Sequence, residues 1–276
     1  PSAVKDLTKT FDYNDINGLR RMFEEYKDRV AAVIMEPVIA EKPTDNFLEN
    51  VKTLTHENDA LLIFDEMISG FRFAMGGIQE YLGVTPDLAT FGKGITNGMP
   101  LGVLAGKAEY MKEFDKVFLS STYAPEALTL AAASANIDFY NKHNVIEKLW
   151  EKGNYIEGRF NLVIKKYKIS KNISLAGYSV RLMVNIHDDD GVQDTKLATL
   201  YQQEMFRHGI LIWSGVLMFS YSHSKDDLDL LVDAFDKTCK TIKDCLNSRN
   251  PIDNYLEGDI GSPVFKDLRK RNAVSN

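Results

Sequence analysis

The stretch LLIFDE at residues 61–66 decides the fold, because an apolar run of strand length there delivers a carboxylate at its carboxyl end. A second stretch, LATFGKG at residues 88–94, delivers a lysine between two glycines directly after another apolar strand. Strands that are apolar on both faces and alternate with helices indicate a parallel sheet covered on both sides. Ligands bind such sheets at the carboxyl ends of the strands. The pattern therefore predicts that Asp65 and Lys93 face one crevice.

The segments around these two strands continue the same alternation. Apolar residues recur at helical spacing in two segments, and short apolar runs predict four strands. The expected helices are residues 15–28 and 47–57, and the expected strands are residues 30–35, 60–64, 88–91 and 101–105. This first part of the chain is predicted to be α/β with a mostly parallel sheet.

A different pattern begins at Pro125. One long helix is expected from there through Tyr140, and a second from Val145 into the 160s. The elements expected after them are strands at 173–175, 180–186, 211–213 and 217–221 and helices at 195–208 and 225–246. Such an order is typical of a separate α+β unit. We expect a large domain at 1–145, a small domain at 146–250 and a polar tail at 251–276.

The composition excludes several classes of protein. The chain has 276 residues, of which 44% are hydrophobic and 26% charged, and its formal net charge is -6. These values predict one large or two modest globular domains. The acidic balance argues against a nucleic-acid partner. Because the sequence has neither a secretory signal nor an apolar run of membrane-spanning length, we expect no membrane span and a cytoplasmic location.

Neither a disulfide nor a metal site is expected. Cys239 and Cys245 lie six residues apart in one expected helix, so their side chains point in different directions. His187 adjoins the acidic run at 188–190, but three aspartates followed by glycine are typical of a solvated turn.

Asp65 and Lys93 each have a plain structural alternative. Asp65 is also suited to cap the turn that follows its strand. A carboxylate buried without a partner is costly, however, so this position predicts a partner. Lys93 fits an exposed turn, but a lysine desolvated in a cleft loses its proton readily and condenses with an aldehyde.

Longer motifs resemble a known family. The stretches DEMISGFR at 65–72 and TFGKGITNGMP at 90–100 resemble the class III aminotransferases, especially the glutamate-1-semialdehyde aminomutase branch. AAVIMEPV at 31–38 is similar to the preceding strand of that family, and the resemblance covers nearly all of residues 1–250. It implies the large domain of a fold type I transferase, incomplete here, with a C-terminal α+β small domain. It also implies the cofactor pyridoxal 5'-phosphate (PLP) and a homodimer.

The resemblance assigns roles to three residues near the two strand ends. Lys93 corresponds to the Schiff-base lysine, which also acts as the general base. Asp65 corresponds to the acid beside the pyridine nitrogen, which keeps that nitrogen protonated. Met67 corresponds to the side chain packed on one face of the ring, where the family often has valine.

Other assignments from the resemblance leave alternatives open. Ser121 and Thr122 correspond to a phosphate-binding segment, in which Thr122 reaches the cofactor of the neighbouring subunit; the alternative is a cap for the helix that follows. Glu36 corresponds to a residue on the substrate side, or else makes a structural hydrogen bond. Arg72 pairs with an anionic substrate group, or else with a local carboxylate such as Glu66.

The sequence also departs from the family. Complete members carry an earlier portion with a glycine- and serine-rich phosphate loop and an aromatic residue that stacks on the cofactor. We therefore expect either one piece of a longer or split polypeptide, or a chain that holds PLP weakly. The stretch STYAPEA at 121–127 differs from the Gly-Asn-Pro pattern of aminomutases. Its Glu-Ala-Leu continuation resembles aminotransferases that act on keto or aldehydo sugars of surface polysaccharides, which implies transfer of an amino group from a small-molecule donor to such a carbonyl compound. An aminomutase and a non-catalytic homologue remain the alternatives.

Overall fold

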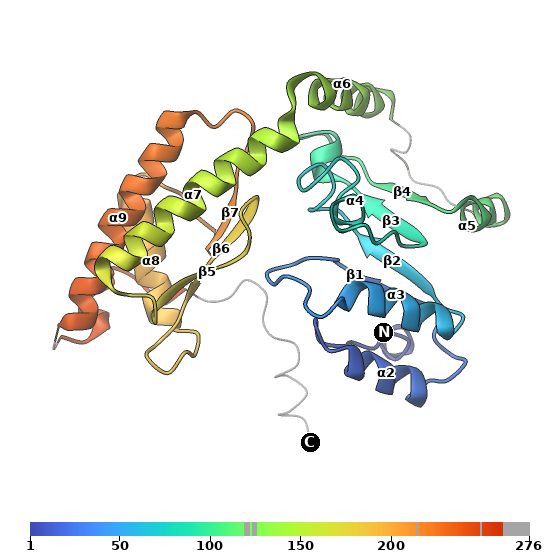
Figure 1. Cartoon of the computed structure of the whole chain (residues 1–276), viewed down its shortest axis with the longest axis horizontal. Helices are drawn as coiled ribbons and strands as arrows, with labels where there is room; N and C mark the ends of the chain where they lie inside the picture. Colours follow the sequence, from blue (N-terminus) through green and yellow to red (C-terminus); the bar gives the residue numbers. More distant parts are fainter. Residues whose placement is uncertain (119–121, 123–125, 214, 249, 262–276) are drawn as a thin grey trace. The chain divides into compact units, whose positions relative to one another are not determined.

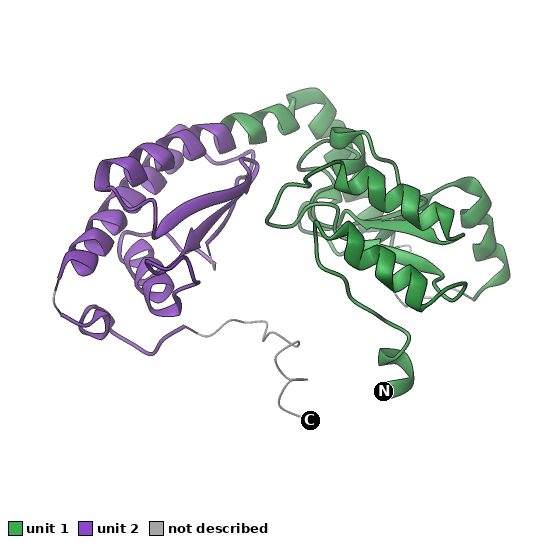
Figure 2. Ribbon diagram, turned by 60° about the horizontal axis from the view of Figure 1, so that its bottom comes forward, with its two compact units in different colours: residues 1–151 green, residues 152–276 purple. Residues whose placement is uncertain are grey.

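The structure is a computed structural model that describes residues 1–118, 122, 126–213, 215–248 and 250–261. The chain divides into two compact units, Pro1–Glu151 and Lys152–Asn276, which are coloured separately in Figure 2. Each unit has its own sheet, and the division falls within one long helix.

Unit 1 contains a four-stranded sheet in the order β1-β2-β3-β4. Its strands are β1 (Ala32–Met35), β2 (Leu61–Asp65), β3 (Leu88–Phe91) and β4 (Val103–Gly106). The first three strands run parallel, and β4 pairs antiparallel with β3 (Figure 1). The prediction of a mostly parallel α/β sheet is therefore confirmed.

Helices alternate with these strands, and those predicted at 15–28, at 47–57 and from Pro125 are present among them. The helices of unit 1 are α1 (Ser2–Lys5), α2 (Ile16–Glu25), α3 (Phe47–Glu57), α4 (Ile78–Leu82), η1 (Lys93–Ile95), α5 (Ala108–Met111), η2 (Lys112–Lys116) and α6 (Ala127–His143). Helices α2 and α3 pack on one another, and α3 also packs on β2 (Figure 1). The core side chains of α3 are Phe47, Leu48, Val51 and Leu54, all buried. They cover an apolar sheet in which Leu62 and Phe64 are fully buried.

Unit 2 is an α+β unit with an antiparallel sheet in the order β5-β6-β7. Its elements are the C-terminal part of α7 (Val145–Tyr167), β5 (Ile173–Tyr178), β6 (Arg181–Ile186), α8 (Thr195–Arg207), β7 (Val216–Met218), α9 (Lys225–Asn247) and η3 (Ile252–Tyr255). One apolar core joins these elements, with the rings of Phe160 and Phe235 stacked at 3.6 Å between centroids. Both cysteines, Cys239 and Cys245, are buried and free.

The strand expected at 211–213 does not form. The Val216 N–H donates to the Trp213 carbonyl at 3.0 Å, so the chain turns there, and Gly215 adopts a φ of 77°. Pairing at Trp213 is limited to a single bridge with Val216, and Leu211 is 87% exposed. The apolar run at this place is therefore a connection that leads into the short strand β7.

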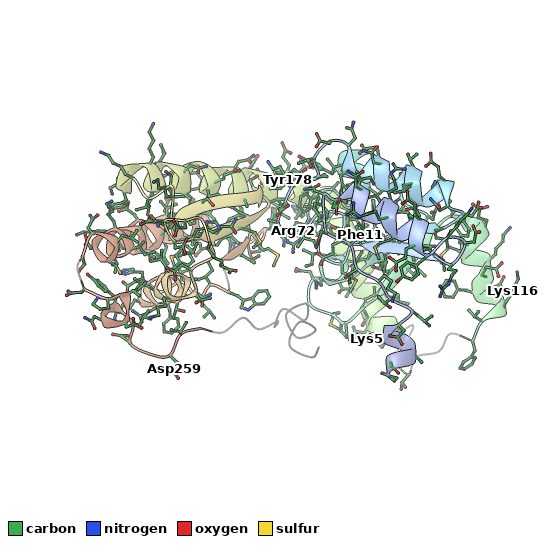
Figure 3. All side chains as sticks on the ribbon, turned by 90° about the horizontal axis from the view of Figure 1, so that it is seen from below. Lys5, Phe11, Arg72, Lys116, Tyr178 and Asp259 are labelled. Atoms are coloured by element: carbon green, nitrogen blue, oxygen red, sulfur yellow. The ribbon has the colours of Figure 1, made fainter. Side chains whose placement is uncertain are left out.

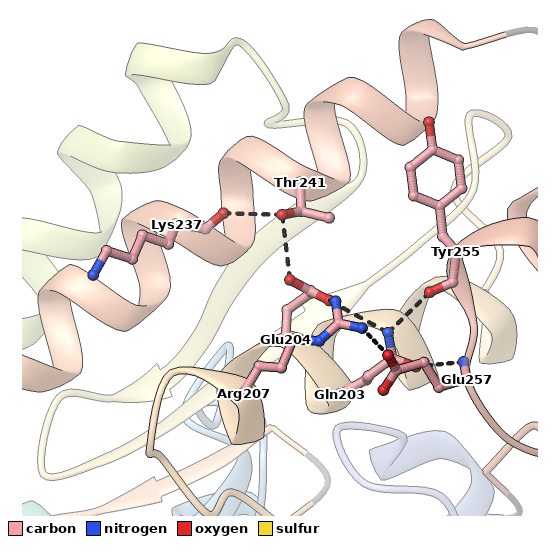
Figure 4. A network of polar contacts seen from close by, with 7 residues as sticks. All are labelled: Gln203, Glu204, Arg207, Lys237, Thr241, Tyr255 and Glu257. Atoms are coloured by element: carbon pink, nitrogen blue, oxygen red, sulfur yellow. Dashed lines mark hydrogen bonds and ion pairs between the residues drawn. The ribbon is translucent and has the colours of Figure 1, made fainter.

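The beginning of the predicted polar tail is built into unit 2. Ile252, Tyr255 and Leu256 pack against the core, and the main chain of Tyr255 accepts from Gln203 Nε2 at 2.9 Å. Arg207 bridges the buried Glu204 and the exposed Glu257 (Figure 4). Within the described part of the chain, no helix is both long and apolar enough to cross a membrane.

A buried carboxylate joins the amino ends of β2 and β3 to the carboxyl end of the antiparallel β4. Asp87 accepts from the Leu62 N–H at 2.7 Å, and it contacts Lys107 Nζ at 2.7 Å and His56 Nε2 at 2.9 Å. Burial by itself would raise the pKa of this carboxyl, but the hydrogen bonds from Lys107, Leu62 and His56 outweigh burial and lower the pKa. Asp87 therefore stabilises the end of the sheet opposite to the predicted crevice.

We expect Asp87→Asn to lower the free energy of unfolding by about 1–3 kcal/mol at neutral pH, because charge-assisted bonds to a buried group are lost. Since the folded-state pKa of Asp87 is lowered, its contribution is present above the unfolded value of 3.8 and is lost as the pH falls through the folded pKa. Denaturant unfolding of both proteins along a pH series measures the difference, which should shrink toward acid.

The control for this prediction is Glu113→Gln, which removes a pair between side chains that are 60% and 70% exposed. It should change the free energy of unfolding by no more than about 0.5 kcal/mol. Equal stability of wild type and Asp87→Asn at neutral pH would contradict the structural role of Asp87.

Candidate active site

Asp65 is the last residue of β2, and one of its oxygens is already engaged. Oδ1 accepts from the Met67 N–H at 3.0 Å and from the Thr90 hydroxyl at 3.3 Å. Thr90 lies opposite Asp65 in the parallel register of β2 and β3. Among the described residues, no hydrogen bond or ion pair to Oδ2 is found. Asp65 therefore does cap the turn that follows it, as the structural alternative proposed, and it still has a second oxygen available.

Lys93 opens the short helix η1 in a strained backbone conformation. Its φ is 47°, in the left-handed region, and Asn97 at the other end of the turn has a φ of 50°. The carbonyl of Lys93 accepts from the N–H groups of Thr96 at 3.3 Å and Asn97 at 3.0 Å. The Lys93 side chain is exposed and has no ion pair or hydrogen bond within the described part of the chain. Strain of this kind in a non-glycine residue is common at functional sites.

The turn after Asp65 and the turn at Lys93 lie directly against each other. A Cβ built on Gly92 would lie 2.4 Å from Met67 Cε, so the Met67 side chain covers the backbone just before Lys93. A Cβ on Gly94 would lie 3.1 Å from Phe71 Cβ and 3.3 Å from the Gly70 carbonyl oxygen. Glycine at both positions allows the two turns to approach this closely. Asp65, Met67 and Lys93 are therefore brought together at one edge of the sheet.

Helix α6 packs on the Lys93 turn. Phe71, Ile95 and Ala133 form a small buried cluster, and Tyr140 meets the Phe71 ring edge to face at 5.8 Å between centroids. From the same helix, Asn136 Nδ2 donates to the carbonyl oxygens of the two residues that follow Lys93. Sequence reasoning missed both Asn136 and Thr90, although Thr90 opens the motif at 90–100, because their contacts exist only in the folded chain.

The neighbour of Asp65 has a purely structural role. Glu66 is fully buried, and its carboxylate accepts from the Ser69 hydroxyl and from the N–H groups of Ile78 and Gln79, both at 2.9 Å. Burial raises the pKa of Glu66, while these three hydrogen bonds partly offset the increase. Glu66 therefore caps α4 with its carboxylate.

Two further residues lie near this edge of unit 1. Glu36 directly follows β1, and the last residue of β1, Met35, is paired with Phe64 of β2. Glu36 therefore lies at the level of Asp65, the residue after Phe64, along the neighbouring strand. The next residue is fixed, since the Tyr13 hydroxyl donates to the Pro37 carbonyl at 2.7 Å. Arg72 is half-buried and is labelled in Figure 3. Burial raises the pKa of the Tyr140 phenol, and the charge of the nearby Arg72 opposes that increase.

The predicted phosphate-binding segment is described only in part. Ser121 lies outside the described residues, and Thr122 is an exposed turn residue. The residue that caps α6 is Glu126, which does so with its own side chain. Its carboxylate accepts from the N–H groups of Leu128 at 2.7 Å and Thr129 at 2.8 Å. Among the residues described, no cluster of three or more His, Cys, Asp or Glu side chains is placed to hold a metal ion.

The fold and this edge define an α/β protein that presents an amine and a carboxylate at neighbouring strand ends. Residues 3–238 match the family model of the class-III aminotransferases, so the chain belongs to that family. The resemblance inferred from the motifs around Asp65 and Lys93 is thereby confirmed.

Several characterised relatives and structures are similar to the chain. It is 32% identical over 256 residues to 3-aminobutyryl-CoA aminotransferase of Cloacimonas acidaminovorans, covering 89% of this chain and 61% of that protein. It is 40% identical over 179 residues to glutamate-1-semialdehyde 2,1-aminomutase of Methanococcoides burtonii, covering 61% of this chain and 42% of the relative.

Two solved structures have the same fold as this chain. The FumI protein of Sphingopyxis sp. MTA144, in its PLP internal aldimine form, superposes with a TM-score of 0.80 at 21% identity, covering 90% of this chain and 60% of that one. An omega-transaminase from Sphaerobacter thermophilus gives a TM-score of 0.79 at 25% identity, covering 88% and 59%. The chain thus spans less than two thirds of the length of each of these proteins.

The close contact between the two turns predicts the effect of adding a methyl group. A Cβ at Gly70 would lie 2.6 Å from Phe91 Cδ1 and 2.9 Å from the Glu66 carbonyl oxygen. Gly70→Ala should lower the free energy of unfolding by about 1–3 kcal/mol, measured by denaturant titration. Gly102→Ala is the matched control, because a Cβ there meets no atom within 4 Å, and it should cost no more than about 0.5 kcal/mol. Similar costs for both substitutions would mean that the turns are not in contact.

Proposed function

We propose that this chain carries the cofactor-binding part of a PLP-dependent aminotransferase, which moves an amino group from a small-molecule donor to a carbonyl acceptor. The observation that carries the proposal is the placement of Lys93 and Asp65 at the carboxyl ends of the adjacent parallel strands β3 and β2. Membership of the class-III aminotransferase family supports it. The FumI structure, which contains PLP, supports the choice of cofactor.

The residues at this edge fit the chemistry of PLP. The cofactor needs an amine for its aldehyde and an acid for its pyridine nitrogen. Lys93 offers an amine without a competing partner among the described residues, and Asp65 offers Oδ2 in addition to the oxygen used by the turn. Met67 places an apolar thioether beside the Lys93 turn, where one face of an aromatic ring would be covered.

In this proposal each residue has a separate task. PLP, when bound, supplies an acceptor for the electrons released at the substrate's Cα. Lys93 would hold the cofactor through its amine, and the same amine, once released, would take up and return the proton at the substrate's Cα. Asp65 keeps the ring nitrogen protonated, and the hydroxyl of Thr90 together with the N–H of Met67 orients its carboxylate.

Further contacts belong to the same proposal. In a homodimer, Ser121 and Thr122 would bind the phosphate group, with Thr122 reaching the cofactor of the neighbouring subunit. Glu36 lies at the level of Asp65 and would face the substrate. The guanidinium of Arg72 suits an anionic group of the donor or the acceptor. For the acceptor we propose a keto or aldehydo compound, with a sugar-like carbonyl as the narrower choice on the basis of residues 121–127.

The test is binding of PLP to the intact protein, followed by visible absorbance and by transfer of the amino group. Wild type should bind PLP and transfer the amino group, whereas Lys93→Ala should lose the PLP absorbance and reduce transfer by about 10²–10⁴-fold or more, because it lacks the positioned base. Lys112→Ala removes an exposed lysine elsewhere in unit 1 and should behave as wild type. PLP binding that survives in Lys93→Ala with its absorbance unchanged would refute the assignment.

A second candidate is an aminomutase, which the Methanococcoides burtonii relative favours. It would use Lys93 and Asp65 in the same way but isomerise one substrate. Omitting the external amino donor separates the two, since product formation stops for an aminotransferase and continues for an aminomutase. A wild-type protein that fails to bind PLP would favour the third alternative, a non-catalytic homologue.

A further inference from the structure

One side chain outside the Lys93 turn holds that turn from a distant part of the sequence. Nδ2 of Asn136, in the middle of α6, donates to the carbonyl oxygen of Gly94 at 2.8 Å and of Ile95 at 3.0 Å. These two carbonyls belong to the residues that directly follow Lys93, and they lie 42 and 41 positions before Asn136 in the sequence. The contact is therefore tertiary and spans two separate elements.

The turn needs a restraint of this kind. Lys93 and Asn97 both have left-handed backbone conformations. These conformations are disfavoured for residues other than glycine. The bonds from Thr96 and Asn97 to the Lys93 carbonyl are local, so they move together with the turn. A strained segment persists only when its surroundings overdetermine it. Asn136 supplies two such bonds from α6, whose Tyr140 also packs on the Phe71 ring.

The position of Asn136 on α6 is suited to this task. Ala133, Ile137 and Tyr140 recur at helical spacing and pack in the same apolar cluster as Ile95. Asn136 lies on this face and is its polar member, with an amide nitrogen that carries two protons for two carbonyl oxygens. The apolar contacts pack α6 on the Lys93 turn, and the side-chain amide of Asn136 fixes the orientation of the peptide groups of Gly94 and Ile95.

We propose that Asn136 is the positioning residue for Lys93. By fixing the peptides that follow Lys93, it holds the Lys93 backbone in the left-handed conformation and so sets the direction in which the side chain leaves the main chain. Loss of the two bonds lets the turn relax to ordinary backbone conformations, which moves the amine. This inference rests on the proposed function of Lys93 and extends it, because it assigns a role to a residue that does not touch the reacting atoms.

The test measures attachment of PLP to Lys93 without any substrate. The intact protein is titrated with PLP and reduced with borohydride, and mass spectrometry of the Lys93 peptide gives the attached fraction. Asn136→Ala and Asn136→Asp should each raise the half-saturating PLP concentration by about tenfold, since each loses two donors. The pH at which the absorbance of bound PLP changes should also shift in both variants. Asn136→Asp keeps the size of the side chain. If Asn136→Ala does not fold, the half-saturating PLP concentration of Asn136→Asp tests the proposal.

Two controls separate positioning from general stability. Asp87→Asn weakens the opposite end of the sheet and should leave the half-saturating concentration and the pH profile as in wild type. Asp138→Asn changes an exposed residue of α6 and should do the same. Hydrogen exchange at the Thr96 and Asn97 amides gives an independent reading without PLP, and it should accelerate only in the Asn136 variants.

The outcomes distinguish this inference from the proposed function. If wild type attaches no PLP to Lys93, the proposed function fails. If wild type attaches PLP and both Asn136 variants match it in half-saturating concentration, pH profile and amide exchange, Asn136 has no positioning role and the function of Lys93 stands.

Discussion

The parallel register between β2 and β3 is the constraint on which the candidate site depends. It sets Asp65 opposite Thr90, and the chain then needs only three more residues to reach Lys93. A shift of this register by one residue would turn every side chain of a strand to the other face. The fully buried Leu62 and Phe64 of β2 oppose such a shift, because it would expose them. The apolar core therefore fixes the main-chain positions of the two strand ends that precede Lys93 and carry Asp65.

Adjacent carboxylates at this strand end have different tasks. Glu66 is fully buried, and its carboxylate accepts hydrogen bonds from Ser69 and from the first turn of α4. Asp65 is only half-buried and accepts with one oxygen from the turn that follows it. Glu66 thus satisfies hydrogen-bond donors of the chain itself, whereas Asp65 keeps one oxygen for a ligand. Glu126 repeats the first task at the start of α6. Glu66 thus has a structural task alone, whereas Asp65 caps its turn with one oxygen and keeps the other.

Much of this arrangement follows from the local pattern of the sequence. The strands that end at Asp65 and just before Lys93 were predicted because apolar runs between turn residues have few alternatives, and helix 47–57 because its apolar residues recur at helical spacing. The strand expected at 211–213 was wrong, because an apolar run alone does not reveal that Gly215 turns the chain. Thr90 and Asn136 were not predicted, because their roles arise from contacts between elements that no local pattern records. Long-range contacts, which decide how Lys93 is held, are the part that sequence reasoning does not reach.

The most direct test of the account is a crystal structure of the intact protein with PLP. The account predicts PLP joined to Lys93 Nζ, with its ring nitrogen about 2.6–3.2 Å from an oxygen of Asp65. A cofactor bound elsewhere, or a ring nitrogen that faces away from the end of β2, would contradict it.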